Sequence, residues 1–206
     1  MTSERTLVVI SAGLSQPSST RLLADRLTGA AARELEALGH TVSVEVIELR
    51  DHAHAVVDAM LTGFPTGELA RVMDTLAKAD GVIAVTPLFT TTYSGLFKSF
   101  VDIVDKDSLG GMPVLLGATG GTPRHSLALD YSVRPLFAYL HADVLATSVF
   151  AATDDWAGDG DRVNPLSARI DRAGRELAQR VSARVNPGPA DPCAGTPSFT
   201  DMLGGA

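Results

Sequence analysis

Residues 6–20 read TLVVISAGLSQPSST, an apolar run followed by a loop rich in hydroxyl side chains. The run 6–10 is apolar and mostly β-branched, which is typical of a strand that is buried on both faces of a sheet. After the loop, leucines and alanines recur at helical spacing from Ser18 to Leu38, and Gly39 ends the pattern. A buried strand followed by an amphipathic helix predicts the first unit of a parallel α/β sheet.

The same alternation of strand and helix continues along the chain. We expect further strands at 41–49, 81–86, 113–118 and 143–149, and helices at 68–79, 94–104, 127–140 and 165–185, with a weaker helix and loop between 51 and 67. Five such units predict a parallel sheet with helices on both faces and right-handed crossovers. Ligands bind such sheets at the carboxyl ends of the strands, so the loops after Ile10, Thr86 and Ala118 form the candidate site.

Composition and charge limit the class of protein. The chain has 206 residues, of which 45% are hydrophobic and 20% charged, as in one globular domain. A formal net charge of −7 disfavours binding to nucleic acid or to an anionic membrane surface. No signal-peptide pattern and no membrane-spanning window is found, so we expect a cytoplasmic protein. Residues 1–186 are interpreted as the domain and the Pro/Gly-rich residues 187–206 as a tail.

The loop after the first strand has the features of a phosphate site. Its hydroxyl groups belong to Ser11, Ser15, Ser18, Ser19 and Thr20. The free amides and dipole of a helix N-terminus attract anions, and hydrogen bonds to a charged acceptor contribute roughly 1.5–3 kcal/mol each. The loop lacks both the dinucleotide-binding fingerprint and the NTPase P-loop, which favours a terminal monophosphate over a pyrophosphate. A serine at this place is also a common N-cap, which explains any single one of them equally well.

The second loop, TPLFTTTYSG at 86–95, offers flat and rigid groups. Pro87, Leu88, Phe89 and Tyr93 are candidates to lie along a planar ligand, and Thr90 is a candidate donor to its polar edge. The alternative is that the aromatic pair serves packing alone.

The third loop, GATGGTPRH at 117–125, contains two adjacent glycines. Gly120 and Gly121 let the backbone approach a planar ligand closely, with Ala118 and Thr119 beside them. A plain turn would explain the glycines as well.

Taken together, the three loops resemble the NADPH-dependent FMN reductase family of flavodoxin-like proteins, over about residues 6–150. The serine-rich first motif is present as Ser11, Ser15, Ser18 and Thr20, although many relatives have an arginine at position 15. The second motif, the most specific, runs from Thr86-Pro87 through Gly95 and Lys98 to Asp102, with Phe89 where many relatives have tyrosine. The resemblance implies a flavodoxin-like, doubly wound sheet of five parallel strands in the order 2-1-3-4-5.

The resemblance also implies an activity, namely hydride transfer from C4 of NADPH or NADH to N5 of FMN. The flavin carries this chemistry, so no catalytic side chain and no metal are predicted. Arg124 and His125 are candidates to contact the nicotinamide nucleotide. Residues 118–125 and 129–136 resemble the branch that supplies reduced flavin to luciferase-like monooxygenases. A homodimer or tetramer is expected, with the apolar helix at 94–104 in the interface.

Three other functions stay open. A quinone or azo reductase would keep FMN bound and reduce a second substrate. A flavodoxin-type electron carrier is disfavoured because only 5% of the residues are aromatic and Trp156 lies outside the three loops. A regulatory module without flavin is disfavoured by the loops together. His52 and His54 are interpreted as surface residues, and Cys193 as a non-catalytic thiol of the tail.

Overall fold

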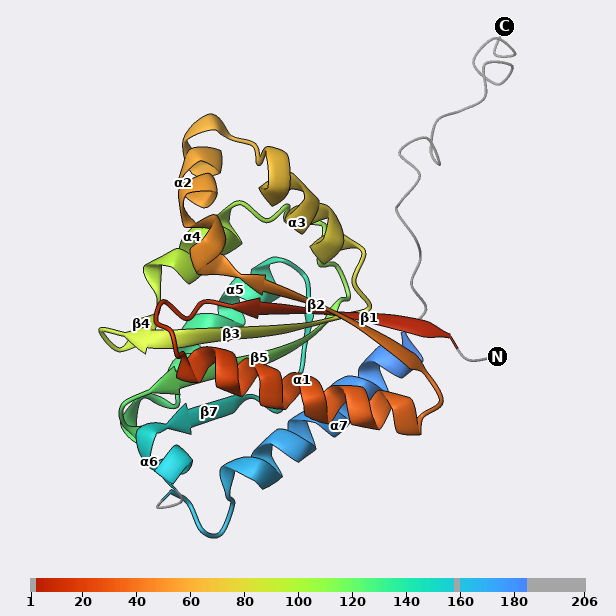
Figure 1. Cartoon of the computed structure of the whole chain (residues 1–206), viewed down its shortest axis with the longest axis vertical. Helices are drawn as coiled ribbons and strands as arrows, with labels where there is room; N and C mark the ends of the chain where they lie inside the picture. The colour runs from red at the N-terminus through yellow and green to blue at the C-terminus, as the bar shows by residue number, and fades with distance from the viewer. Residues whose placement is uncertain (1–2, 158–159, 185–206) are drawn as a thin grey trace, which may run out of the picture.

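The computed structural model describes residues 3–157 and 160–184 and has a central sheet between two layers of helices (Figure 1). The sheet has seven strands, and its main path is the parallel order β2 (Thr41–Glu48), β1 (Glu4–Ser11), β3 (Gly81–Phe89), β5 (Pro113–Gly120) and β6 (Asp143–Val144). One face is covered by α1 (Ser19–Ala37) and α7 (Leu166–Ala183). The other face is covered by α2 (Ala53–Thr62), α3 (Gly67–Ala77), α4 (Gly95–Asp102) and α5 (Arg134–Tyr139).

The alternation of side chains along β1 separates two hydrophobic cores. Val8 and Ile10 face the layer of α2 to α5, whereas Leu7 and Val9 face α1 and α7. All four are at most 1% exposed, which agrees with a strand buried on both faces. Ser11 follows Leu7 and Val9 in the alternation, so it belongs to the face toward α1 at the carboxyl end of the strand.

The predicted strand at 143–149 is broken after Val144 and resumes at Val149 as a separate strand, which corrects the expected count of five. β6 is followed by β7 (Val149–Ala152), and both pair parallel to β5. The break between β6 and β7 is stabilised by a residue far away in the sequence. The Glu176 carboxylate accepts hydrogen bonds from the backbone N–H groups of Ala146 (2.9 Å) and Thr147 (3.2 Å). The Arg134 guanidinium donates to the Leu145 carbonyl at 2.7 Å. A seventh strand, β4 (Thr92–Tyr93), forms an antiparallel hairpin with β3.

Other elements differ from the prediction in detail. The helix expected at 127–140 begins with a π-helical turn, η3 (Leu129–Val133), and continues as α5. Three short elements were not predicted, namely η1 (Leu49–His52), η2 (Pro123–His125) and α6 (Thr153–Ala157). The weak region at 51–67 contains the full helix α2.

The apolar residues of α4, which were expected to lie in an interface between copies of the chain, do not form a free surface. Phe97 and Phe100 are 0% exposed and Val101 is 7% exposed, all within the core beside the sheet. Leu96 and Val104 are partly buried and pack against the same core. The chain therefore uses this helix for its own interior.

Two further sequence predictions concern the tail and membrane-spanning segments. The tail at 187–206, with Cys193, lies outside the described residues. Within the parts of the chain that are described, no helix combines the length and the apolar character needed to cross a membrane.

Candidate functional site

The three predicted loops meet at the carboxyl edge of the sheet, where β1, β3 and β5 end side by side (Figure 1). The backbone N–H of Ala12 donates to the Val85 carbonyl at 3.0 Å, which ties the first loop to β3. The hydroxyls of Thr20 and Thr119 form a buried hydrogen bond of 2.8 Å between the first and third loops. Thus residues 99 positions apart in sequence share one site.

In the first loop the hydroxyl groups have different environments. Ser18 is the N-cap of α1 and accepts a hydrogen bond from the Arg21 N–H at 3.2 Å. Ser15 and Ser19 are exposed beside it. Ser11 is 0% exposed, and its Oγ has no hydrogen-bond partner among the described residues. A buried hydroxyl of this kind usually binds a ligand or an ordered water.

Gly13 brings the backbone of this loop close to the helix. A Cβ on Gly13 would lie 2.1 Å from the Ser18 Oγ and 3.2 Å from the Thr20 Cβ. Only a residue without a side chain can therefore form this narrow turn over the N-terminus of α1. Gly13 is not among the residues predicted from the sequence, although its place between a strand and a hydroxyl-rich loop is a usable signal.

The second loop is mostly a β-hairpin. Leu88 pairs with Tyr93 and Phe89 with Thr92, so Thr90 and Thr91 form a two-residue turn with φ values of 51° and 74°. Positive φ is unfavourable for β-branched residues. The hairpin extends β3 beyond the neighbouring strands, and Phe89 on it is 48% exposed. This exposure leaves the Phe89 ring available to a ligand.

Tyr93 and Pro87 pack mainly against other residues of the chain. The Tyr93 ring packs against Phe97, with 6.4 Å between the centroids. Pro87 and Ala118 are buried in neighbouring strands, so neither side chain is available to a ligand. The sequence left two roles open for Tyr93, contact with a planar ligand or packing within the chain. The contact with Phe97 supports packing.

The two glycines of the third loop differ. A Cβ on Gly120 would lie 2.9 Å from Cζ of Phe150, so this glycine is needed for packing. A Cβ on Gly121 would meet no described atom within 4 Å. Arg124 is exposed and His125 half-buried on η2, directly after the turn. The open space beside Gly121 is where a planar ligand can approach the backbone.

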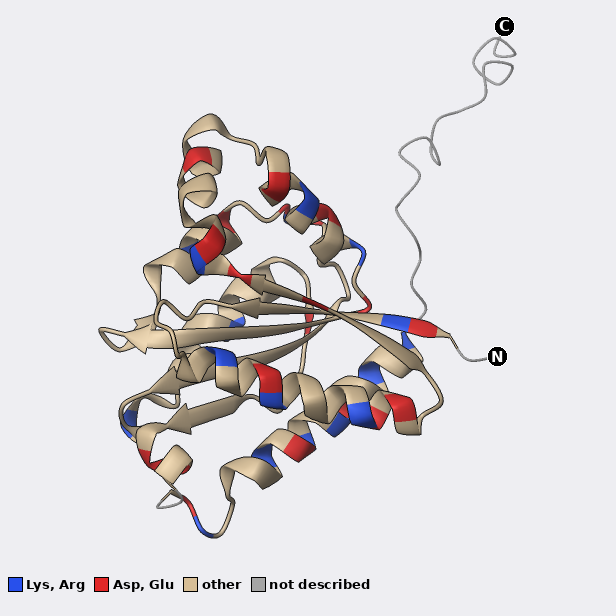
Figure 2. Ribbon diagram, in the orientation of Figure 1, with Lys and Arg blue, Asp and Glu red and all other residues tan. Residues whose placement is uncertain are grey.

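The site carries little charge, although the chain is acidic. In the ranges 11–20, 86–95 and 117–125, Arg124 is the single Lys, Arg, Asp or Glu residue. Figure 2 shows the same contrast, with the charged residues concentrated on the helices. An anion that enters this edge therefore meets amides and hydroxyls of the loops, and the carboxylates nearest the first loop, Asp25 and Glu48, are both paired with Arg21.

Two arginines beside the first loop were missed in the sequence. The Arg50 Nη1 lies 3.5 Å from the Ser15 carbonyl, and Arg50 and Arg21 line a cavity of about 330 Å³ together with Ser15 and Ser18. Hydrogen bonds from Arg21 to the carboxylates of Asp25 and Glu48 hold the pKa of Arg21 above its usual value. Arg50 follows β2, whose carboxyl end lies beside that of β1, and this topology was the available signal.

The arrangement fits a ligand with a phosphate and a flat aromatic ring. Hydroxyls and helix amides are available to the phosphate, and the exposed Phe89 ring and the open side of Gly121 are available to the ring. FMN is a ligand of this kind, and the unpartnered Ser11 Oγ and the Gly13 turn suit its phosphate end.

Comparisons with known proteins agree with this chemistry. The family model described as NADPH-dependent FMN reductase matches residues 5–157. The chain belongs to this family, which confirms the resemblance drawn from the three motifs.

Two FMN reductases match over nearly their whole length. An FMN reductase (NADPH) from Pseudomonas aeruginosa is 35% identical, with 89% of this chain and 96% of the relative covered. The NADH-dependent FMN reductase SfnF from Pseudomonas fluorescens is 33% identical, with 88% and 94% covered. The crystal structure of an oxidoreductase from Corynebacterium diphtheriae has 44% identity and a TM-score of 0.84, with 88% and 99% covered.

Proposed function

We propose that this chain takes a hydride from NADPH or NADH, delivers it to FMN and releases the reduced FMN. The enzyme class follows from family membership: the chain is an NAD(P)H-dependent FMN reductase, an oxidoreductase. The main support for the proposed FMN site is that three nearly uncharged, hydroxyl-rich loops meet at the carboxyl edge of the sheet.

The first loop holds the FMN phosphate in this proposal. The hydroxyls of Ser15 and Ser19 are exposed and free to donate, while Ser18 and Thr20 fix the start of α1 so that its amides point to the anion. Ser11, the last residue of β1, donates its buried Oγ–H to the same phosphate. These hydrogen bonds replace the water that the phosphate loses on binding.

The second and third loops hold the isoalloxazine ring. The ring lies against Phe89, with Leu88 and Tyr93 supporting the hairpin and the backbone at Pro87 and Thr90 along its edge. The opposite edge rests on the backbone where β5 ends, at Gly120 and Gly121, with the buried Ala118 and Thr119 beneath it. Backbone N–H groups there stabilise negative charge on the reduced ring by fixed dipoles.

The nicotinamide nucleotide binds over the exposed face of the ring. Arg124 is the charged group placed to contact its phosphates, and His125 lies beside it on η2. When bound, FMN supplies the hydride acceptor at N5, and the protein needs no acid or base for that step. The relatives include enzymes named for NADPH and for NADH, so both nucleotides are proposed as substrates.

Two features of the wider context belong to the proposal. The likeness of residues 118–125 and 129–136 to reductases of two-component systems supports a luciferase-like monooxygenase as the user of reduced FMN. A homo-oligomer and a cytoplasmic location are proposed as well, the latter supported by the single cysteine.

Steady-state turnover tests the proposal. We expect NAD(P)H oxidation by the purified chain to require added FMN and to saturate at micromolar FMN, as for an ordinary enzyme substrate. The reason is that a site with one open face holds oxidised FMN only moderately. Riboflavin, which lacks the phosphate, serves as the control and should need a far higher concentration for the same rate. A rate that does not change with added FMN would mean that the flavin is a retained cofactor.

A further inference from the structure

The proposed phosphate site has no positively charged side chain on its own loop. A phosphate monoester such as that of FMN carries a charge of about −1.5 to −2 at pH 7. The loop from Ser11 to Thr20 supplies hydroxyls and helix amides, but it contains no Lys or Arg residue. The chain as a whole has a net charge of −7, which opposes the approach of an anion. A cation from another part of the chain would therefore strengthen phosphate binding.

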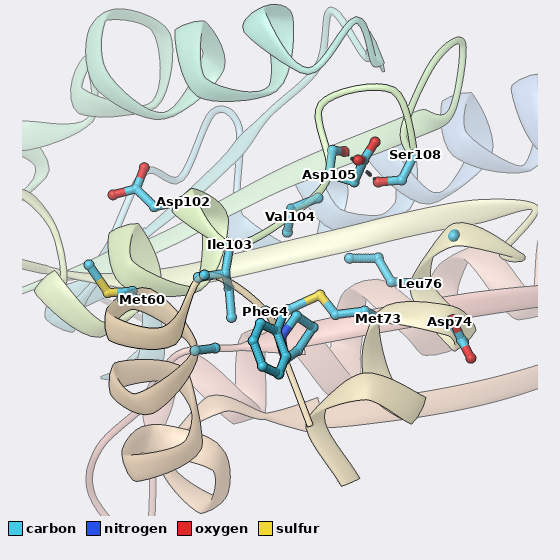
Figure 3. A pocket seen from close by; sticks show the side chains of 14 residues that line it. Met60, Phe64, Met73, Asp74, Leu76, Asp102, Ile103, Val104, Asp105 and Ser108 are labelled. Carbon is cyan, nitrogen blue, oxygen red and sulfur yellow. Dashed lines mark hydrogen bonds between the residues drawn. The ribbon is translucent and has the colours of Figure 1, made fainter. Parts of the chain in front are cut away.

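A cavity of about 600 Å³ between α2, α3 and the end of α4 offers no such cation. Figure 3 shows the side chains of Phe64, Met73 and Ile103 gathered at its centre, with the carboxylates of Asp74 and Asp105 farther out. Among the described residues that line this cavity there is no Lys, Arg or His. An anionic ligand is therefore repelled from it.

The cavity of about 330 Å³ beside the first loop differs, because two arginines line it together with Ser15 and Ser18. The first of them, Arg21 on α1, already has two anionic partners. Its guanidinium donates to the carboxylates of Asp25 at 2.7 Å and of Glu48 at 2.5 Å. These two carboxylates neutralise the charge of Arg21, so Arg21 attracts a further anion only weakly.

The second arginine, Arg50 on η1, is held mainly by neutral acceptors. Its Nη1 lies 3.5 Å from the Ser15 carbonyl. In the amide orientation that satisfies both groups, the side-chain oxygen of Gln16 accepts a hydrogen bond from the same Nη1 at 2.9 Å. The Asp51 carboxylate lies 3.5 Å from Nε, but this side chain is 65% exposed and solvent screens the pair. The charge of Arg50 is therefore largely available to an anion at the loop.

We propose that Arg50 supplies the positive charge that binds the FMN phosphate, together with the hydroxyls and helix amides of the first loop. This role rests on the proposed function, since it requires FMN at that loop. The topology brings Arg50 there, because it follows β2 and the carboxyl end of β2 pairs with that of β1, Glu48 opposite Ser11. The side chain of Arg50 is only 23% exposed, so its attraction for a phosphate is stronger than at an open surface. A guanidinium also matches a phosphate with two parallel hydrogen bonds.

Titration of FMN without a nicotinamide nucleotide is the first test. Arg50→Gln should raise the Kd for FMN about 30- to 100-fold, since a charged partner of the phosphate is lost. Arg50→Lys should raise it less, about 3- to 10-fold, because lysine keeps the charge but not the paired donors. The affinity for riboflavin, which has no phosphate, should not change in either variant. Arg33→Gln is the matched control, since it removes the same charge from a 67% exposed side chain farther along α1 and should leave the Kd unchanged.

Salt dependence separates a charge at the phosphate from a merely structural role in holding the loop. Raising the ionic strength from 0.01 to 1 M shortens the Debye length from about 30 to about 3 Å. The affinity of wild type for FMN should fall several-fold over this range, and that of Arg50→Gln should fall clearly less. If Arg50 acted only through hydrogen bonds to Ser15 and Gln16, both proteins would respond to salt alike.

Three results would overturn the proposal. These are an Arg50→Gln variant that binds FMN as wild type does, an Arg50→Lys variant that binds it as poorly as Arg50→Gln, and equal salt dependence of wild type and Arg50→Gln. A higher KM for NADPH alone, with the KM for NADH and the Kd for FMN unchanged, would overturn it too and assign Arg50 to the 2′-phosphate of NADPH. Because FMN binding is measured without turnover, a chain that binds FMN but fails to reduce it would contradict the proposed function and not the role of Arg50.

Discussion

Replacing Ser15 and Ser19 together by alanine is expected to raise the Kd for FMN by roughly 30- to 1,000-fold. The physical reason is the loss of two hydrogen bonds to a doubly charged phosphate, which amounts to about 2–4 kcal/mol of binding free energy. Both serines are exposed, so the free energy of unfolding should change by less than about 0.5 kcal/mol. Isothermal titration of FMN and urea denaturation measure the two quantities separately.

Riboflavin is the control for these serines, because it has the same ring and no phosphate. Its affinity should be weak for wild type and unchanged by the two substitutions. Ser18 and Thr20 are less suitable for this test, since Ser18 caps α1 and Thr20 bonds to the buried Thr119. Their removal would destabilise the fold as well. Equal affinity of wild type for FMN and riboflavin would show that the phosphate binds elsewhere or contributes nothing.

The second large effect is expected from Gly121→Val, which should weaken flavin binding about 10- to 100-fold. The new side chain would enter the open space beside the turn, where the edge of the isoalloxazine ring is proposed to lie. No described atom lies within 4 Å of the new Cβ, so the free chain can accept it without rearrangement. The thermal transition should keep its midpoint, and fluorescence titration with FMN gives the affinity.

Gly120→Val is the informative comparison for Gly121→Val. Its Cβ would lie 2.9 Å from the Phe150 ring, so this variant should lose stability before any effect on flavin can be read. Contrasting behaviour of the two glycines is therefore expected. If Gly121→Val binds FMN as wild type does, the turn is ordinary and does not support the ring.

The architecture was predictable because each buried strand is a continuous apolar run. The sequences of β1, β3 and β5 have no other stable place than the centre of a parallel sheet, and this fixes which loops share an edge. The split between β6 and β7 was not predictable, since it depends on Glu176, 30 residues away from Ala146. Local sequence pattern contains no information on such a contact.

The position of the candidate site could be predicted from the sequence, but the role of each residue in it could not. The sequence indicates which residues reach the edge, and Thr20 and Thr119 do meet there. It does not distinguish Gly120, which packs on Phe150, from Gly121, which faces open space. It also places the apolar residues of α4 in an interface, whereas Phe97 and Phe100 are buried in the core of the chain. In both cases the deciding neighbours come from distant parts of the chain.

The central claim, that reduced FMN leaves the protein, is tested most directly by filtration without oxygen. The chain is mixed with NADPH or NADH and a large molar excess of FMN, and the mixture is passed through a membrane that retains a 21.5 kDa protein. We expect many equivalents of reduced FMN per chain in the filtrate. Reduction of the retained flavin alone, with further turnover only after a quinone is added, would contradict the account and favour a quinone reductase. No reduction by either nucleotide would contradict it as well and favour an electron carrier.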